Sequence, residues 1–216
     1  MKLGILGGTF NPIHIAHLRI AEEVRDRLTL DQVLFIPAAT PPHKPLAGEL
    51  SFETRYEMVT LAIAGNPSFT ATDMEGRRQG KSYSIDTLRA LRAERPGDEL
   101  YFIIGSDSYL DFGSWYKYEA IFDLCNIVVV ERPGAAIADL LQALPATIAG
   151  SFRRQHDPGR LLHDSGHQVQ YLPGIPLEIS SSAIRDLAAS GRSFTYLVPS
   201  AVEQYIKEKR IYEHAG

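Results

Sequence analysis

Two histidines stand three residues apart, directly behind a glycine-rich turn near the amino terminus. The stretch GGTFNPIHIAH places His14 and His17 after Gly7 and Gly8, with Pro12 fixing the turn. Glycines let a ligand approach the backbone closely, and the start of a helix offers free N–H groups and a positive dipole end that attract phosphate. Imidazoles at such a place can donate hydrogen bonds to phosphate oxygens without removing a proton. The pattern therefore indicates a phosphate-binding site.

Three other interpretations of His14 and His17 stay open at this point. The rings could simply pack at the start of a helix, or they could bind zinc in a hydrolase. The metalloprotease pattern, however, carries a glutamate inside the motif, and this sequence has none there. A nucleotide sensor that binds without turning over would keep the same residues.

A second helix start repeats the phosphate-binding chemistry. The stretch EISSSAIRDL places Ser180, Ser181 and Ser182 at the start of a predicted helix, with Arg185 one turn later. Serine hydroxyls and free amides can cap phosphate oxygens, and a guanidinium grips them with two hydrogen bonds. A plain serine N-cap is the alternative. Two such helix starts in one chain favour a polyphosphate ligand.

Other nucleotide and metal motifs fail. GRRQGKS (residues 76–82) has three residues between its glycines where a P-loop needs four, and no G-x-G-x-x-G stretch is present. The later histidines lie in a polar, glycine-containing stretch without helical ligand spacing, so we predict solvated chain there rather than a metal site. The residues concerned are His156, His163 and His167, with Asp157 and Asp164.

Composition limits the possible classes of protein. The chain has 216 residues, 44% of them hydrophobic and 22% charged, which is typical of a single globular domain. The net charge of −4 argues against nucleic-acid binding. Cys125 stands alone, which excludes an intramolecular disulfide. The first apolar run is too short for a secretion signal and no stretch suits a membrane span, so we predict a cytoplasmic protein, either a monomer or a homodimer.

Apolar runs alternate with helical spacing along most of the chain. We predict strands at residues 2–6, 32–37, 68–73, 99–105, 126–134 and 168–172. We predict helices at residues 15–28, 51–64 with Ser51 as cap, 85–95, 135–144, 181–189 and 199–208. Residues 38–50 form a long loop, and periodicity fades over 146–167.

This alternation predicts an α/β fold, a Rossmann-like doubly wound, mainly parallel sheet with helices on both faces. The first strand is expected near the centre of the sheet, with ligands beyond the carboxyl ends of the strands. One domain is expected over residues 1–216, with residues 180–212 as a C-terminal subregion.

The combined motifs resemble a known superfamily. GGTFNPIHIAH with ISSSAIR is similar to the H-x-G-H nucleotidyltransferases, which are related in fold to class I aminoacyl-tRNA synthetases. Nearly the whole chain apart from residues 146–167 resembles the bacterial nicotinate-nucleotide adenylyltransferase family. The motifs concerned are PPHK (41–44), SYSIDTL (82–88), IIGSDSYLDFGSWYKYEAI (103–121), VERPG (130–134) and LVPSAVEQYIKEKRIY (197–212). Asn11 replaces an aspartate of many relatives and Ala16 a glycine, which affects only fine packing near the adenine or ribose.

The resemblance implies transfer of AMP from ATP to nicotinate mononucleotide in NAD biosynthesis, with Mg²⁺ on the triphosphate and no metal site of the protein's own. Direct displacement needs positioning rather than a base, because the attacking phosphate is already ionised. The ATP side is expected to comprise backbone at Gly7, Gly8, Thr9 and Phe10, the rings of His14 and His17, Gly105, Asp107, Ser181, Ser182 and Arg185. Lys44 is expected near the join of the two substrates, and His14, His17, Arg185 and Lys44 are the predicted catalytic residues.

The resemblance also implies a pyridine pocket. Trp115, the single tryptophan, should stack on the ring, since an indole face suits a flat cation. The amides of Ile85 and Tyr116 should receive the nicotinate carboxylate, with Tyr83, Ser84 and Arg132 lining the pocket. Phosphopantetheine adenylyltransferases and cytidylyltransferases are the nearest rivals, although the former are usually shorter and have no need of this tryptophan.

Overall fold

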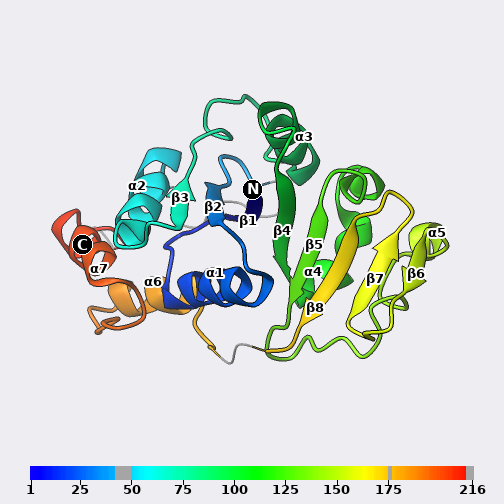
Figure 1. The fold of residues 1–216 in the computed structure, drawn as a ribbon. Helices are drawn as coiled ribbons and strands as arrows, with labels where there is room; N and C mark the ends of the chain where they lie inside the picture. The colour runs from blue at the N-terminus through cyan, green and yellow to red at the C-terminus, as the bar shows by residue number, and fades with distance from the viewer. Residues whose placement is uncertain (42–49, 175–176, 213–216) are drawn as a thin grey trace.

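A single twisted sheet runs through the protein (Figure 1). The computed structural model describes residues 1–41, 50–174 and 177–212, and the described chain forms eight strands in the order β3-β2-β1-β4-β5-β8-β7-β6. Neighbours from β3 to β8 are parallel, and β7 and β6 are added in antiparallel fashion. The strands are β1 (Lys2–Gly8), β2 (Gln32–Pro37), β3 (Phe69–Ala71), β4 (Glu99–Gly105), β5 (Asn126–Val130), β6 (Phe152–Arg154), β7 (Arg160–His163) and β8 (Gln168–Leu172).

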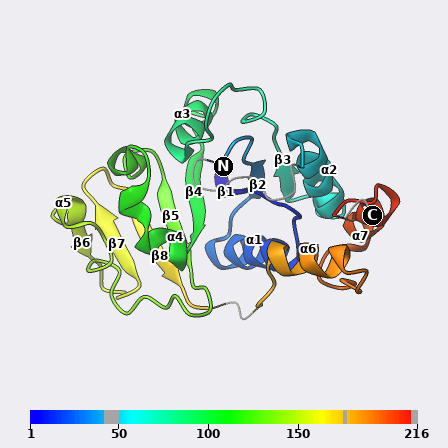
Figure 2. The ribbon, with the colours of Figure 1, turned by 180° about the vertical axis from the view of Figure 1, so that it is seen from behind.

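Helices cover both faces of this sheet. They are α1 (Ile15–Leu28), α2 (Phe52–Ile63), α3 (Ser84–Glu94), α4 (Ser106–Leu110), α5 (Ala146–Ala149), α6 (Ser181–Ala189) and α7 (Ser200–Glu208), with 3-10 turns η1 (Phe112–Ser114) and η2 (Tyr118–Ile121). As predicted, Ser51 caps α2: its hydroxyl accepts the Thr54 N–H at 3.2 Å. Both views show α1 and α6 side by side (Figures 1 and 2). Within the described residues, none of these helices has the length and apolarity needed to cross a membrane.

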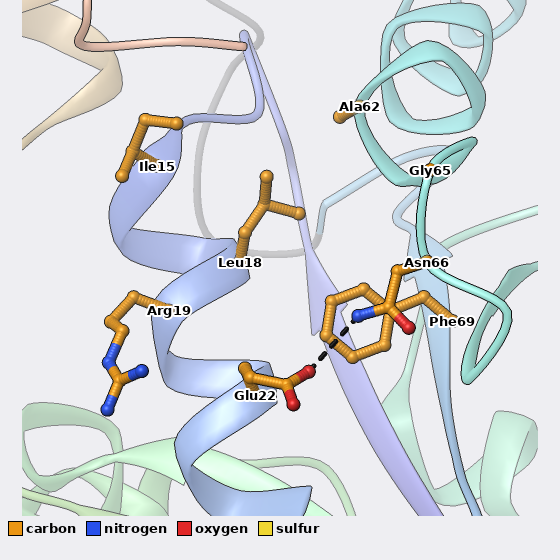
Figure 3. A pocket seen from close by; sticks show the side chains of 8 residues that line it. All are labelled: Ile15, Leu18, Arg19, Glu22, Ala62, Gly65, Asn66 and Phe69. Carbon is orange, nitrogen blue, oxygen red and sulfur yellow. Dashed lines mark hydrogen bonds between the residues drawn. The ribbon is translucent and has the colours of Figure 1, made fainter.

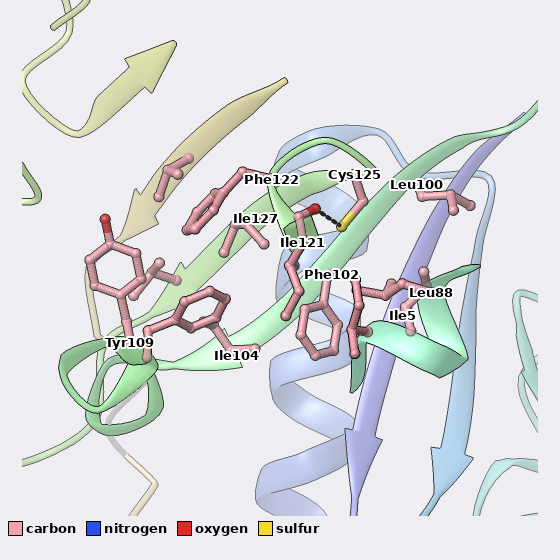
Figure 4. Close-up of a cluster of buried hydrophobic side chains, with 14 of the residues drawn as sticks. Ile5, Leu88, Leu100, Phe102, Ile104, Tyr109, Ile121, Phe122, Cys125 and Ile127 are labelled. Carbon is pink, nitrogen blue, oxygen red and sulfur yellow. Dashed lines mark hydrogen bonds between the residues drawn. The ribbon is translucent and has the colours of Figure 1, made fainter. Parts of the chain in front are cut away.

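The central strands are buried on both sides because alternate side chains enter two different cores. In β4, Phe102 and Ile104 join a core under α3 (Figure 4), whereas Ile103 joins the core under α1 and α2. Each fully buried side chain of this kind contributes about 1.5–3 kcal/mol. Cys125 lies in the α3-side core, where burial raises the pKa of its thiol to about 12. The two cores fix the helices to the sheet and so position the loops between them.

The predicted doubly wound architecture is confirmed, with β1 between β2 and β4. The predicted helix at 135–144 is wrong, because that segment forms turns. The Asp139 carboxylate accepts the N–H groups of Leu141 and Gln142, a local bond that competes with helix formation. The predicted fifth strand ends at Val130 rather than at residue 134, since a proline and a left-handed glycine follow.

The stretch 146–167 is also more ordered than predicted. It contains α5 and the antiparallel pair β6 and β7, whose Phe152 and Leu161 are buried in the α3-side core. His156 and Asp157 are exposed as expected, but His163 packs against Phe152 with ring centroids 4.7 Å apart. Strands this short carry too few residues for a visible period.

Candidate active site

The carboxyl ends of β1 and β4 lie next to each other. The two strands pair up to Leu6 opposite Ile103, so Gly8 and Gly105 each lie two residues beyond that pair. From here β1 connects to β2 on one side, while β4 connects to β5 on the other. Such a switch in strand order opens a crevice that binds ligands in α/β proteins.

The two histidines lie together at the start of α1, which follows the turn after β1. His14 is the N-cap of α1, and its backbone N–H donates to Nδ1 of His17 at 3.2 Å. Their rings stack with centroids 3.7 Å apart. Because Nδ1 of His17 is the acceptor, its neutral ring carries the proton on Nε2, which is therefore a donor.

Both imidazoles are held in the neutral form. His14 is 5% exposed, and burial lowers its pKa to about 4, with the charge of Arg132 adding to the effect. Burial also lowers the pKa of His17 well below its usual value, assisted by His14 and Arg132. Nδ1 of His14 is buried and has no hydrogen-bond partner in the described part of the chain. These rings are suited to donating hydrogen bonds rather than to carrying charge.

Phe10 also packs against His17. Its backbone is left-handed, with φ of 48°, and its buried ring meets the His17 ring edge-on at 5.1 Å. A Cβ atom on Gly8 would lie 3.0 Å from the Phe10 ring, so this glycine permits Phe10 to pack. Gly7 is exposed, and a Cβ there would come no closer than 4.0 Å to Phe102. The approach of a ligand is therefore more open at Gly7.

Side chains from the C-terminal region hold the turn that precedes His14. The Ser181 hydroxyl donates to the Pro12 carbonyl at 2.8 Å, and Nη1 of Arg185 donates to the Asn11 carbonyl at 2.8 Å. The Tyr212 hydroxyl donates to Oδ1 of Asn11 at 2.6 Å. The two predicted phosphate-binding segments are thus in direct contact.

Some groups predicted to face phosphate are used inside the protein. The Ser180 hydroxyl accepts the Ala183 N–H at 3.2 Å, which is the plain N-cap considered as the alternative. The hydroxyl of Ser181 is bonded to the turn, and the first N–H of α1, at Ile15, donates to the Leu197 carbonyl at 2.9 Å. The backbone amides of Ser181 and Ser182 are the more suitable donors to a ligand.

An ion pair between Arg132 and Asp107 lies next to Gly105. Nε of Arg132 lies 3.5 Å from Oδ1 of Asp107, and both side chains are about half exposed. A Cβ on Gly105 would lie 2.3 Å from that oxygen and 2.7 Å from that nitrogen. The Arg132 backbone N–H donates to the Ser106 hydroxyl at 2.8 Å. The positive charge of Arg132 also lowers the pKa of His14 and His17, so Arg132 acts electrostatically on both rings.

Aromatic side chains gather beyond the end of β4. One face of Trp115 stacks on Phe112, with ring centroids 4.9 Å apart, and the rings of Trp115 and Phe102 form a T-shaped pair with centroids 6.1 Å apart. The indole is partly buried, so it has a structural role in the α3-side core. Tyr83 and Tyr116 lie with ring centroids 4.6 Å apart.

The start of α3 faces the same region. Tyr83 is its N-cap, and Ser84 and Ile85 are its first two helical residues. Ile85 is 0% exposed as a whole residue, and its backbone N–H lies in the first turn of α3, where N–H groups have no partner within the helix. Helix amides at such positions suit a carboxylate.

Comparisons with known proteins identify the family of this chain. Residues 5–187 match the model of the cytidylyltransferase-like family. A probable nicotinate-nucleotide adenylyltransferase from Geobacter metallireducens is 68% identical, with 99% of each chain covered. One from Geotalea uraniireducens is 66% identical, with both chains fully covered. The chain belongs to the nicotinate-nucleotide adenylyltransferase family.

Solved structures share the fold of this adenylyltransferase. The Plasmodium falciparum nicotinic acid mononucleotide adenylyltransferase, solved in complex with NaAD, superposes with a TM-score of 0.75 at 19% identity, covering 98% of this chain and 97% of that one. A putative nicotinate-nucleotide adenylyltransferase from Vibrio parahaemolyticus gives a TM-score of 0.67 at 18% identity, with coverage of 100% and 98%.

The two departures from the family pattern are accommodated. Asn11 accepts the Tyr212 hydroxyl through its side-chain oxygen. Ala16 is buried within α1, where a helical backbone tolerates a methyl group. Lys44 lies outside the described residues. Among those that are described, no three His, Cys, Asp or Glu side chains group to hold a metal ion.

Residues that sequence reasoning missed connect the segments of this candidate site. Arg55 is fully buried and donates to the Thr9 carbonyl, and Tyr212 holds Asn11. The Ser82 hydroxyl accepts the Ala39 N–H at 3.0 Å. A cation on the apolar face of a helix is the signal that could have revealed Arg55, since Met58 and Val59 one turn later are buried.

A separate pocket of about 320 Å³ lies between α1 and the end of α2 (Figure 3). Glu22 in its wall already bonds to Nδ2 of Asn66 at 3.1 Å and to Arg25. The pocket contains none of the predicted site residues; its lining is Ile15, Leu18, Arg19, Glu22, Ala62, Gly65, Asn66 and Phe69. The crevice at the strand ends is therefore the better candidate for chemistry.

Proposed function

We propose that this chain transfers AMP from MgATP to nicotinate mononucleotide, forming nicotinate adenine dinucleotide and pyrophosphate for NAD biosynthesis. Full-length relatives at 55–68% identity are described as probable nicotinate-nucleotide adenylyltransferases. The observation that carries the mechanism is the stacked, neutral pair His14 and His17 beside the glycine turn.

The reaction is a direct in-line displacement. A phosphate oxygen of the mononucleotide attacks the α-phosphorus of ATP, and the bond from that phosphorus to the bridging oxygen breaks as pyrophosphate leaves. The attacking oxygen is ionised beforehand, so no side chain accepts a proton and no covalent intermediate forms. Nε2 of His17 and the His14 ring donate to phosphate oxygens as charge builds up, which supports His14 and His17 as catalytic residues.

Residues are assigned to the ATP side by the hydrogen-bond donors that they do not already use within the protein. Gly7, Gly8, Thr9 and Phe10 supply backbone at the turn, and Gly105 and Asp107 border the nucleotide at the end of β4. The amides of Ser181 and Ser182 bind the β- and γ-phosphates. Nη1 of Arg185 donates to the Asn11 carbonyl, and the remaining N–H groups of its guanidinium donate to phosphate. Lys44 completes the phosphate contacts.

The pyridine ring stacks on the face of Trp115 opposite Phe112. The amides of Ile85 and Tyr116 receive its carboxylate, and Tyr83 and Ser84 line the pocket. The closeness of Tyr83 and Tyr116 supports this assignment.

Arg132 lines the mononucleotide pocket with Tyr83 and Ser84. Its charge also lowers the pKa of His14 and His17, so it acts on both sides of the site.

Pyrophosphate release tests the proposal. The protein is incubated with ATP and Mg²⁺ and either nicotinate mononucleotide, nicotinamide mononucleotide or phosphopantetheine. We expect turnover with the first and a lower kcat/KM with the second. Turnover with phosphopantetheine alone, use of CTP in place of ATP, or stoichiometric bound zinc would contradict it. The cytoplasmic location predicted from the sequence is part of the same proposal.

A further inference from the structure

Arg55 places a buried cation beneath the glycine turn. It projects from the face of α2 that also carries Met58 and Val59, and it is 0% exposed. Its Nη1 donates to the Thr9 carbonyl at 2.8 Å and to the Ala38 carbonyl at 2.7 Å, and its Nη2 donates to the Ala39 carbonyl at 3.3 Å. One guanidinium therefore hydrogen-bonds both to the turn after β1 and to residues 38 and 39, which directly follow β2 and are called the exit of β2.

This arrangement is costly for stability alone. Burial lowers the pKa of Arg55, and Tyr212, Glu53 and Glu75 only oppose that effect from nearby. Its Nε is buried without a hydrogen-bond partner in the described part of the chain. An apolar side chain packed in the same place would avoid the desolvation penalty of a buried charge. The benefit of the guanidinium is its rigid geometry, which sets the spacing of three carbonyl oxygens.

The exit of β2 is fixed from the opposite side by Ser82. The Ser82 hydroxyl accepts the N–H groups of Ala39 and Thr40 at 3.0 and 3.1 Å, and the Ser82 N–H donates to the Thr40 carbonyl at 2.9 Å. Ser82 directly precedes Tyr83, the N-cap of α3. Hydrogen bonds thus run without a break from the ATP turn through Arg55 and residues 38–40 to the proposed pyridine side.

We propose that Arg55 is a positioning residue for adenylyl transfer, which sets the distance between the turn that holds ATP and the segment that holds the mononucleotide. This inference rests on the proposed function. Each substrate is bound mainly by groups on its own side of Arg55, so loss of the guanidinium should leave both affinities nearly intact. In-line alignment would suffer instead, because a shift of about 1 Å can lower the rate about 100-fold.

The test compares Arg55→Lys and Arg55→Met with a matched pair at Arg92. Arg92 also holds two carbonyls, those of Asp98 and Leu124, at 2.7 and 2.5 Å, but at the amino ends of the strands. We expect kcat to fall about 100-fold in Arg55→Met, and less in Arg55→Lys, with each KM within about 3-fold of wild type. Arg92→Lys and Arg92→Met should lower Tm and leave kcat unchanged.

Ser82→Ala covers the case in which Arg55→Met fails to fold, since it removes no buried charge. This variant removes the hydrogen bonds that the Ser82 hydroxyl accepts from residues 39 and 40, in the segment that Arg55 contacts from the opposite side. It should lower kcat without a matching rise in KM. Unchanged kcat in both Arg55→Lys and Ser82→Ala, or an equal fall in kcat in the Arg92 variants, would overturn the positioning role of Arg55. Neither result would contradict the proposed function. A wild-type protein that releases no pyrophosphate would overturn the proposed function itself.

Discussion

The neutral state of His14 has a measurable consequence for stability. Its pKa is about 4 in the folded protein, against an ordinary value of 6.5. The unfolded chain therefore takes up the proton first as the pH falls, and stability is lost between those two values. At pH 5, the ratio of protonation factors corresponds to about 2 kcal/mol of lost unfolding free energy relative to pH 7.5. His17 has a lowered pKa too and changes stability in the same direction.

Urea unfolding of the wild type and of His14→Asn at both pH values isolates this effect. Asparagine does not titrate and is a good N-cap, so it suits the start of α1. We expect wild type to lose about 2 kcal/mol more than the variant between the two pH values. His156→Asn, at an exposed site, is the control and should behave like wild type. Equal losses in wild type and His14→Asn would refute the neutral, buried His14.

Three further outcomes follow from the site. His17→Ala should lower kcat at least about 100-fold while the protein stays folded by circular dichroism, and nearly normal turnover would remove His17 from its assigned role. Trp115→Ala should weaken nicotinate mononucleotide binding far more than ATP binding in calorimetry, whereas equal losses would speak against the stacking. Gly105→Ala should displace the side chains of Asp107 and Arg132, because a Cβ atom would lie 2.3 and 2.7 Å from them. The KM for ATP should therefore rise, while the free energy of unfolding changes by less than about 1 kcal/mol. An unchanged KM for ATP would show that Asp107 and Arg132 do not bind the nucleotide.

The parts of the fold with strong local signals could be predicted from the sequence. Continuous apolar runs identified the central parallel strands β1, β2, β4 and β5, and Ser51 marked the start of α2. The segment 135–144 misled because its apolar spacing suits a helix, while Asp139 forms a competing turn. The strands β6 and β7 are too short to show a period, and only tertiary packing of Phe152 and Leu161 forms them.

The types of residues at the site were predictable, but their contacts were not. Nothing in ISSSAIR shows that the Ser181 hydroxyl bonds to the Pro12 carbonyl, because that contact depends on how α6 meets the glycine turn. The neutral state of His14 likewise arises from burial, which appears only once the chain is folded. Arg55 is different, because its place on the helix face that carries Met58 and Val59 could have indicated its burial.

The stereochemical course at the α-phosphorus tests the central claim most directly. ATP in which sulfur replaces one non-bridging oxygen of the α-phosphate, so that this phosphorus is chiral, is converted with nicotinate mononucleotide, and the configuration of the dinucleotide product is determined. A single in-line displacement, aligned by the turn and by His14 and His17, predicts inversion. Retention would require two displacements through an enzyme-bound nucleotide and would contradict the account.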